Sequence, residues 1–105
     1  MGWATPYISR LREGHTVQFN PRGNSMTPKI NSGDLCTVVP VGPGGVAVEE
    51  LQKGDIVLCK VGGREYLHLI SAIQGKRFQI SNNHGHVNGW TSDSQIFGKC
   101  VSVEA

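Results

Sequence analysis

Short runs of β-branched and aromatic residues, each bounded by turn residues, constrain the fold of this chain more than any other feature. Such runs form strands, and the glycine, asparagine and proline residues between them favour tight turns. With 14 glycines in 105 residues, turns are available at short intervals along the whole chain. The runs that we expect to be strands are 15–19, 35–40, 55–61, 64–73, 77–81 and 95–103. The pattern predicts a mainly β domain, with "NNHGHVNGW" as a longer loop after residue 81.

The N-terminal segment departs from this pattern and predicts one short helix within "TPYISRLREG". Thr5 would cap the helix, Pro6 would occupy its first turn, and Gly14 would end it. Ile8 and Leu11 would form a small apolar face. We expect no more than one further short helix.

Length and charge limit the classes of function. A chain of 105 residues has the size of one domain with a modest core, so we expect residues 1–105 to form a single domain. The formal net charge is +2 and the basic residues are scattered, unlike the basic stripe of a nucleic-acid-binding surface. The sequence has no apolar run of the ~18–20 residues that a membrane span needs, and its N-terminus lacks a signal-peptide core. We therefore expect a soluble protein with no nucleic-acid partner and no membrane span.

The cysteines Cys36, Cys59 and Cys100 lie in apolar runs that we expect to be strands. Their number is odd, and their spacing is unlike that of a zinc site. We interpret them as buried free thiols, which are typical of proteins in the reducing cytoplasm.

The segment "PRGNSMTPKINSGD" places Ser25 between flexible residues and a stiff turn, which raises the question of a nucleophile. A serine hydroxyl is a poor nucleophile until a base within hydrogen-bond reach takes its proton. The candidate bases are a desolvated lysine or one of His15, His68, His84 and His86. His68 stands out because "EYLHLISAI" places it in mid-strand among apolar residues that would hold the imidazole still. Taken singly, Ser25 also fits a turn or cap serine, and His68 fits a half-buried core histidine.

Three segments, in order, resemble the clan of serine peptidases that contains the signal peptidases and the self-cleaving LexA-type repressors. "GNSMTPKINSGD" is similar to their Ser-Met-x-Pro box followed by Gly-Asp. "LQKGDIVLCKVGGREYLHLISAI" is similar to their second Gly-Asp turn and the hairpin that ends at the general base, and "FQISNNHGHVNGW…IFGKCVSV" to their last loop and closing strand. The resemblance covers residues 16–104 and leaves residues 1–15 as an N-terminal segment outside it. It implies a coiled, partly open β-barrel with at most one or two short helices.

The resemblance also implies roles for the residues around the serine. Ser25 would be the nucleophile, Met26 would form the substrate-side wall, and Pro28 would stiffen the turn that follows. The oxyanion hole would use the backbone N–H groups of Ser25 and Asn24. Many signal peptidases place a helpful hydroxyl two residues before the nucleophile. Gly23 stands there in this chain, so backbone donors must suffice.

The two Gly-Asp pairs of these boxes, Gly33–Asp34 and Gly54–Asp55, have a structural interpretation. Glycine supplies the positive φ of a tight turn, and the aspartate carboxylate accepts hydrogen bonds from nearby backbone N–H groups. We expect both pairs to be turns that take no part in chemistry.

The base of bacterial signal peptidases and LexA-type proteins is a lysine, and His68 stands at the aligned position in this chain. This choice resembles the Ser-His pair of eukaryotic and archaeal signal peptidases. A lysine needs strong desolvation before it accepts a proton near neutrality, whereas a histidine, with a pKa near ~6.5, needs almost none. A Ser25–His68 pair would therefore be competent without a deeply buried site.

Two departures from the clan's pattern bear on activity. Leu69 replaces the basic residue that usually follows the base, and Asn82 and Asn88 stand where the acidic residue of the last box is expected. An asparagine can accept a hydrogen bond from the imidazole but cannot stabilise imidazolium with charge. Asp93, slightly further along, would substitute if the loop folded back.

His84 and His86 form the pair "HGH", which supplies two potential metal ligands. A zinc site needs a third protein ligand, and none is evident at a suitable spacing. We interpret both as solvent-exposed loop histidines and expect neither a metal nor another cofactor.

These observations predict a soluble, cytoplasmic serine endopeptidase that acts on a peptide or protein substrate with a Ser25–His68 dyad. The missing acidic residue and Leu69 favour an alternative, a non-catalytic module that keeps the fold and binds an extended peptide or protein along a sheet edge. The ~20 residues before the serine box are too few for the helix-turn-helix of LexA-type repressors, so we expect no DNA contact.

Overall fold

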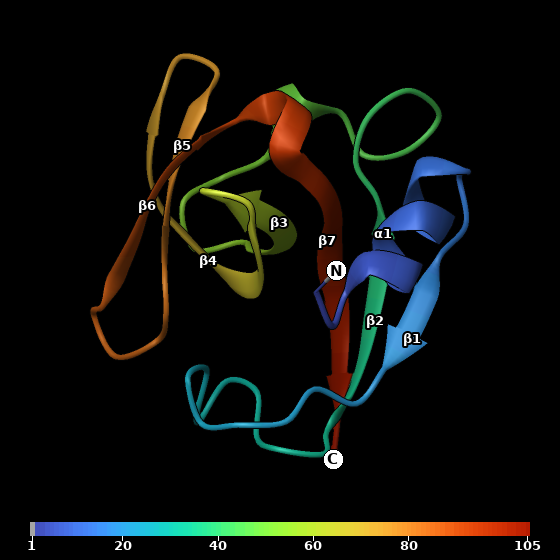
Figure 1. Ribbon diagram of the computed structural model, residues 1–105, viewed down its shortest axis with the longest axis vertical. Helices are drawn as coiled ribbons and strands as arrows, with labels where there is room; N and C mark the ends of the chain where they lie inside the picture. The colour runs from blue at the N-terminus through green and yellow to red at the C-terminus, as the bar shows by residue number, and fades with distance from the viewer. Residues whose placement is uncertain (1) are drawn as a thin grey trace.

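The computed structural model describes residues 2–105 as a seven-stranded antiparallel sheet with one α-helix packed against it (Figure 1). The strands are β1 (Val17–Phe19), β2 (Leu35–Pro40), β3 (Ile56–Val61), β4 (Arg64–Gln74), β5 (Arg77–Ser81), β6 (Val87–Ser92) and β7 (Ile96–Glu104), and two single 3-10 turns are η1 (Val48–Glu50) and η2 (Asp93–Gln95). The strand order is β1-β2-β7-β3-β4-β5-β6. Over the described residues the edge strands β1 and β6 do not pair with each other, so the sheet is not closed into a barrel. The prediction of a mainly β protein with one short α-helix is confirmed.

Register shifts coil this sheet. They interrupt the ladders between β2 and β7, β3 and β7, β4 and β5, and β5 and β6. An extra residue in a ladder bends its strand and increases the local twist. In Figure 1, β7 runs along the length of the molecule while β3 and β4 are seen nearly end-on, which shows how far the sheet turns across its width. β4 pairs with β3 on one side and β5 on the other, so it lies in the interior of the sheet.

The start of the helix α1 (Thr5–Arg12) differs from the prediction, because the N-cap is Ala4 and not Thr5. Alanine has no side chain that can cap a helix, and the carboxylate of Glu65 on β4 supplies the missing acceptor. It accepts hydrogen bonds from the Ala4 N–H at 2.7 Å and from the Thr5 hydroxyl at 2.6 Å. A carboxylate at this end also complements the positive end of the helix dipole. The cap therefore comes from a residue about 60 positions away, which no local pattern could indicate.

The rest of the helix agrees with the prediction. Pro6 lies in the first turn, and Ile8 and Leu11 are buried. Gly14 follows the helix with a φ of +91°, a left-handed conformation that favours glycine. Leu11 packs against β7 at Gly98, where a Cβ atom would lie only 2.9 Å from Leu11 Cδ1. The glycine of the closing strand therefore makes room for α1.

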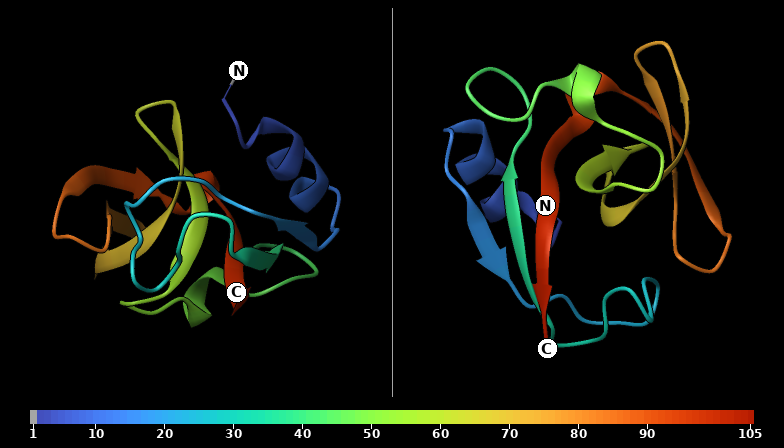
Figure 2. Two further views of the ribbon diagram at one scale, coloured as in Figure 1. Left: turned by 90° about the horizontal axis from the view of Figure 1, so that it is seen from below. Right: turned by 180° about the vertical axis from the view of Figure 1, so that it is seen from behind.

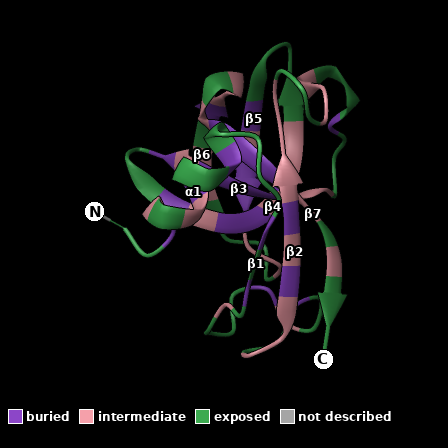
Figure 3. Cartoon of the chain, turned by 90° about the vertical axis from the view of Figure 1, so that its right-hand side faces the viewer, coloured by how far each residue is buried: buried purple, intermediate pink, exposed green. Residues whose placement is uncertain are grey.

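Buried side chains form two apolar clusters. The first packs α1 and the loop between β1 and β2 onto the sheet, and it includes Met26 and Ile30 of that loop. The second lies among β3, β4 and β5 and includes Phe78. β3 contributes to both clusters because successive side chains of a strand point to opposite faces, so Leu58 joins the first and Val57 the second. Figure 3 shows this burial along the strands, while the loops and chain ends are mostly exposed.

The segment "NNHGHVNGW", predicted as a loop, is a loop only in its first half. Its second half begins β6, which pairs with β5 from Arg77↔Ser92 to Ser81↔Val87. Asparagine and glycine disfavour strands, and Gly89 has a φ of +140°, so the local pattern hides this strand. Pairing with β5 imposes it. Over residues 2–105 no helix has the length and apolar character needed to cross a membrane.

All three cysteines are free thiols, as predicted. Cys36 and Cys59 are buried, and burial raises the pKa of each thiol to about 12. The predicted burial is wrong for Cys100, which is half-buried, although desolvation raises its pKa too. Protonated thiols are poor nucleophiles, so the cysteines do not compete with Ser25 for that role.

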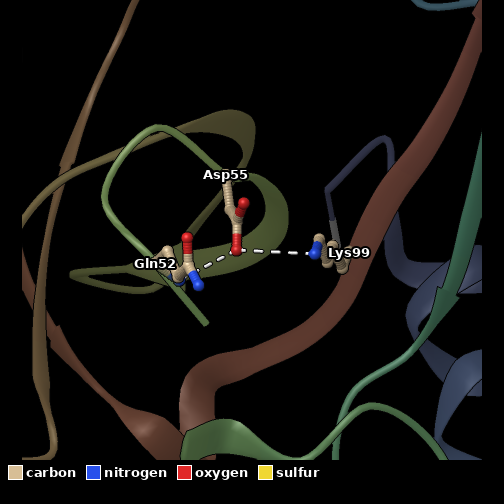
Figure 4. A network of polar contacts seen from close by, with 3 residues as sticks. All are labelled: Gln52, Asp55 and Lys99. Atoms are coloured by element: carbon tan, nitrogen blue, oxygen red, sulfur yellow. Dashed lines mark hydrogen bonds and ion pairs between the residues drawn. The ribbon is translucent and has the colours of Figure 1, made fainter. Parts of the chain in front are cut away.

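Both Gly-Asp pairs form the predicted turns, and both glycines have positive φ angles, +90° and +97°. The carboxylate of Asp34 accepts a hydrogen bond from the N–H of Asn31 at 2.8 Å. In the same way the carboxylate of Asp55 accepts from the N–H of Gln52 at 2.9 Å, and it also lies 3.6 Å from the ammonium group of Lys99 on β7 (Figure 4). The second turn is therefore tied to the sheet by an ion pair as well as by its own backbone.

Candidate active site

Ser25 and His68 meet at hydrogen-bond distance, with Ser25 Oγ 3.1 Å from His68 Nε2. The other ring nitrogen, Nδ1, lies 2.7 Å from Oδ1 of Asn88. Because an amide oxygen can only accept, Nδ1 carries the ring proton, and Nε2 is left to accept the proton of the serine hydroxyl. The tautomer that a general base requires is therefore set by Asn88.

Each of these side chains is positioned by a different kind of element. His68 lies in the middle of β4, and only 8 % of its surface is exposed. Asn88 lies on β6 between the pairs Ile80↔Gly89 and Ser81↔Val87, so it is the extra residue of a β-bulge. A bulge re-aims side chains, and this one accompanies the contact between the amide and the imidazole. Ser25 is exposed on the loop between β1 and β2.

Burial lowers the pKa of His68 below its usual value of 6.5, because desolvation penalises the imidazolium form. The hydrogen bond that Nδ1 donates to Asn88 acts in the opposite direction, and the electrostatic effect of the nearby His86 lowers the pKa further. The ring of Tyr66, on the same strand, lies 5.0 Å from the imidazole between centroids. His68 is therefore neutral, and able to accept a proton, at neutral pH.

The loop between β5 and β6 holds the loop of Ser25 in place. The N–H of Asn83 donates to the Ser25 carbonyl at 2.8 Å, and its side-chain amide donates to the Thr27 carbonyl at 2.9 Å. Nε2 of His84 lies 2.9 Å from the carbonyl oxygen of Asn24 and 3.0 Å from Oγ1 of Thr27. Figure 2 shows the two loops, orange and light blue to cyan, approaching at one end of the molecule. The sequence analysis missed these contacts, and no local signal indicates them.

The backbone N–H groups of Asn24 and Ser25 are available to a ligand. Within the described residues neither group donates a hydrogen bond, although the Asn24 carbonyl accepts from Thr27 and His84 and the Ser25 carbonyl accepts from Asn83. The neighbouring N–H of Gly23 is already occupied, because it donates to Ser32 Oγ at 3.2 Å. The oxyanion hole predicted at Asn24 and Ser25 therefore has free donors, and its role stays a prediction.

A pocket of about 450 Å³ opens beside Ser25 and His68. Met26, predicted as part of the substrate-side wall, is 5 % exposed and lines it. Apolar side chains from the N-terminal segment, β1 and β4 form much of the remaining lining, among them Trp3, Tyr7, Phe19 and Leu67. Ser25 and His68 thus lie at the edge of a concave, largely apolar site of the size that holds a small ligand or a side chain.

Asp93 does not reach this site. It begins η2, its N–H donates to the carbonyl of Lys76, and it lines a different pocket with Leu11. Asp93 was expected to orient the imidazole only if the loop folded back, and the chain does not fold back there, because β6 continues to Ser92 as a strand. Asn88 takes that position alone.

The remaining loop residues have structural contacts. Asn82 Oδ1 accepts hydrogen bonds from the N–H groups of His84 and His86, which closes the turn between β5 and β6. Both histidines are exposed, as predicted, although His84 also binds the loop of Ser25. In residues 2–105 no group of three or more His, Cys, Asp or Glu side chains is arranged to hold a metal ion.

No family model matches the chain, and no curated protein matches it.

Proposed function

We propose that this protein is a serine endopeptidase of the signal-peptidase and LexA clan, with Ser25 as nucleophile and His68 as general base. The observation that carries the proposal is the 3.1 Å contact between Ser25 Oγ and His68 Nε2, together with the 2.7 Å contact between Nδ1 and Asn88. A nucleophile within reach of a base that a third group orients is the arrangement that activates a serine. The proposal also assigns the coiled sheet of this protein to the fold of that clan.

The reaction would proceed through an acyl-enzyme. Ser25 Oγ attacks the carbonyl carbon of the substrate while its proton passes to His68 Nε2, and the N–H groups of Ser25 and Asn24 bind the resulting oxyanion. The imidazolium then gives its proton to the leaving amine as the C–N bond breaks. Water, with His68 again as base, hydrolyses the ester and restores the serine. Asn88 holds the ring through these steps but contributes no negative charge toward the imidazolium.

One observation favours a second candidate, a non-catalytic module that binds an extended peptide or protein. The group that orients His68 is the neutral Asn88, and Leu69, where the clan has a basic residue, is half-buried and packs against the first apolar cluster. The strands β1 and β6 are sheet edges, which can add a ligand strand through main-chain hydrogen bonds. This candidate predicts peptide binding without a reactive serine.

Covalent labelling distinguishes the two candidates without knowledge of the substrate. The parent protein, Ser25→Ala and the control Ser9→Ala would each be treated with a serine-reactive phosphonate and weighed intact. Ser9 is an exposed serine on α1, so its variant keeps the site unchanged. We expect the parent and Ser9→Ala to gain one phosphonyl group and Ser25→Ala to gain none. An unlabelled parent, or a labelled Ser25→Ala, contradicts the peptidase proposal.

A further inference from the structure

The pocket beside Ser25 has an aromatic wall, and two of its three rings come from the N-terminal segment outside the resemblance to peptidases. Trp3 and Tyr7 belong to the N-terminal segment, and both pack on Phe19 of β1. The ring centroids of Tyr7 and Phe19 are 4.5 Å apart and stacked, and those of Trp3 and Phe19 are 5.6 Å apart and edge-on. Trp3 is 49 % exposed although it lines the pocket that contains both reacting side chains. A large aromatic side chain left this open has apolar area to contribute to a ligand.

The wall is tied to the strand that carries the base. Glu65, three residues before His68 on β4, binds the Ala4 N–H and the Thr5 hydroxyl with its carboxylate. Its backbone carbonyl also accepts a hydrogen bond from the Trp3 indole N–H at 3.3 Å. The aromatic wall and the imidazole are therefore held on one strand, so a group that fills the pocket lies at a set distance from the reacting atoms.

The chemistry of the pocket favours an apolar occupant. Its floor contains Met26, Ile30 and Leu67, each 4–5 % exposed. Glu65 is buried, and its two carboxylate oxygens already accept hydrogen bonds from α1, so it is not a free partner for a basic side chain. Arg22 also lines the pocket and is exposed. A single methyl group would leave most of the roughly 450 Å³ unfilled.

We infer that the substrate carries a large apolar or aromatic side chain beside its reacting carbonyl, and that the wall of Trp3, Tyr7 and Phe19 selects for it. The inference rests on the proposed function, because it assigns the substrate class of that site. Burial of a benzyl group in the pocket removes much apolar area from water, whereas burial of a methyl group removes little. We therefore expect the site to prefer the benzyl-bearing substrate over the methyl-bearing one on the order of tenfold or more.

A binding experiment tests the pocket without any catalytic step. N-acetyl-phenylalanine amide and N-acetyl-alanine amide would be titrated into Ser25→Ala while the indole N–H signals of Trp3 and Trp90 are followed by NMR. Trp90 lies on β6 outside the pocket and serves as the internal control. We expect a saturable shift of Trp3 with the phenylalanine compound, a much weaker one with the alanine compound, and no shift of Trp90. Equal binding of both compounds, or an unmoved Trp3, overturns the inference. A stronger shift with N-acetyl-aspartate amide also overturns it and indicates Arg22 as the selecting residue.

A labelling experiment then connects the pocket to the serine. The rates of a benzyl- and a methyl-substituted phosphonofluoridate would be compared in the parent, in Trp3→Ala and in the control Trp90→Ala. We expect the benzyl-to-methyl rate ratio to fall on the order of tenfold in Trp3→Ala and to stay at the parent's value in Trp90→Ala, whose side chain lies outside the pocket. An unchanged ratio overturns the inference and leaves the proposed function standing. If neither reagent labels Ser25, the proposed function fails, and the NMR titration still decides the inference.

Discussion

The two halves of the candidate dyad are held by different forces. His68 lies on β4, whose backbone is hydrogen-bonded to β3 and β5, and its side chain is almost fully buried. Ser25 lies on a loop without regular secondary structure, which is held by the burial of Met26 and Ile30 in the first apolar cluster and by hydrogen bonds from Asn83 and His84 of another loop. The candidate base is thus fixed by the sheet, and the candidate nucleophile by loop packing and individual hydrogen bonds.

Because of this difference, we expect substitutions in the two regions to affect the site in different ways. A strand in the interior of a sheet opens only with much of the fold, whereas the exposed part of the loop around Ser25, held by hydrogen bonds from another loop, can open locally at a smaller cost in free energy. Substitutions around β4 should therefore change the chemistry of the base, and substitutions around the loop should change the position of the nucleophile.

The largest effect is expected from removing the base. His68→Ala should lower the rate of phosphonate labelling by roughly 10²–10⁴-fold, because the serine hydroxyl loses the group that takes its proton. His15→Ala, which replaces an exposed histidine ahead of β1, is the matched control and should label like the parent. Stopped-flow or quenched mass measurements would give the rates, and circular dichroism would check the fold. Equal rates in His68→Ala and the parent would show that the dyad is wrong.

A smaller loss is expected from releasing the loop of Ser25. His84→Ala removes the contacts to Asn24 and Thr27 and should lower the labelling rate by about 10- to 100-fold, because small misplacements of a reacting atom are costly. His84→Gln, whose amide can still donate to the Asn24 carbonyl, should recover part of the loss.

Amide hydrogen exchange sharpens this test. Residues of the Ser25 loop should exchange faster in His84→Ala, and residues of β4 should be unchanged. Faster exchange in both regions would mean that the loop and the strand form one cooperative unit, which would remove the distinction between them.

The pH dependence of labelling tests how the surroundings of His68 on β4 set the pKa of this candidate base. His68 must be neutral to accept a proton, and burial lowers its pKa below 6.5, so the labelling rate should fall only as the pH drops below that value. Asn88→Asp would place a negative charge near Nδ1 and stabilise imidazolium, which should move this acidic limb upward by about one pH unit or more. His86→Ala should move it slightly in the same direction, because the electrostatic effect of His86 lowers the pKa of His68. A limb that stays in place in Asn88→Asp would show that Asn88 does not contact the ring in solution.

The smallest effects are expected at the two Gly-Asp turns, which share the same hydrogen bond from a backbone N–H to the aspartate. Asp34→Ala and Asp55→Ala each remove one hydrogen bond to a backbone N–H and should each lower the free energy of unfolding by about 1 kcal/mol in urea titrations. Asp55→Ala also loses its partly exposed ion pair with Lys99, worth only about a few tenths of a kcal/mol. Asp34 ends the loop of Ser25, so its variant alone should also slow labelling. Equal labelling by the two variants would argue that the Gly-Asp turn does not help to place the serine.

The sequence predicted much of the site because its signals are local or pairwise. The motifs around Ser25 and His68 indicated that the two side chains pair as candidate nucleophile and base, and Asn88 was one of two candidates for the group that orients the ring. The choice between Asn88 and Asp93 depended on β6, a strand whose asparagine and glycine residues resemble a loop. Local propensity is weak in such a segment, and pairing with β5 decides its conformation.

The sequence by itself determined the strand runs, the body of α1 and the two Gly-Asp turns. Each depends on side chains within a few residues of one another, as in the hydrogen bond from Asn31 to Asp34. Only the tertiary structure decided that Glu65 caps α1, that a bulge aims Asn88 at His68, that His84 holds the serine loop, and that Trp3 reaches the pocket. These contacts join residues 20 to 61 positions apart in the chain. They exist because the coiled sheet brings β4, β6 and two loops close together. The spacing of residues in the sequence does not predict which distant elements meet.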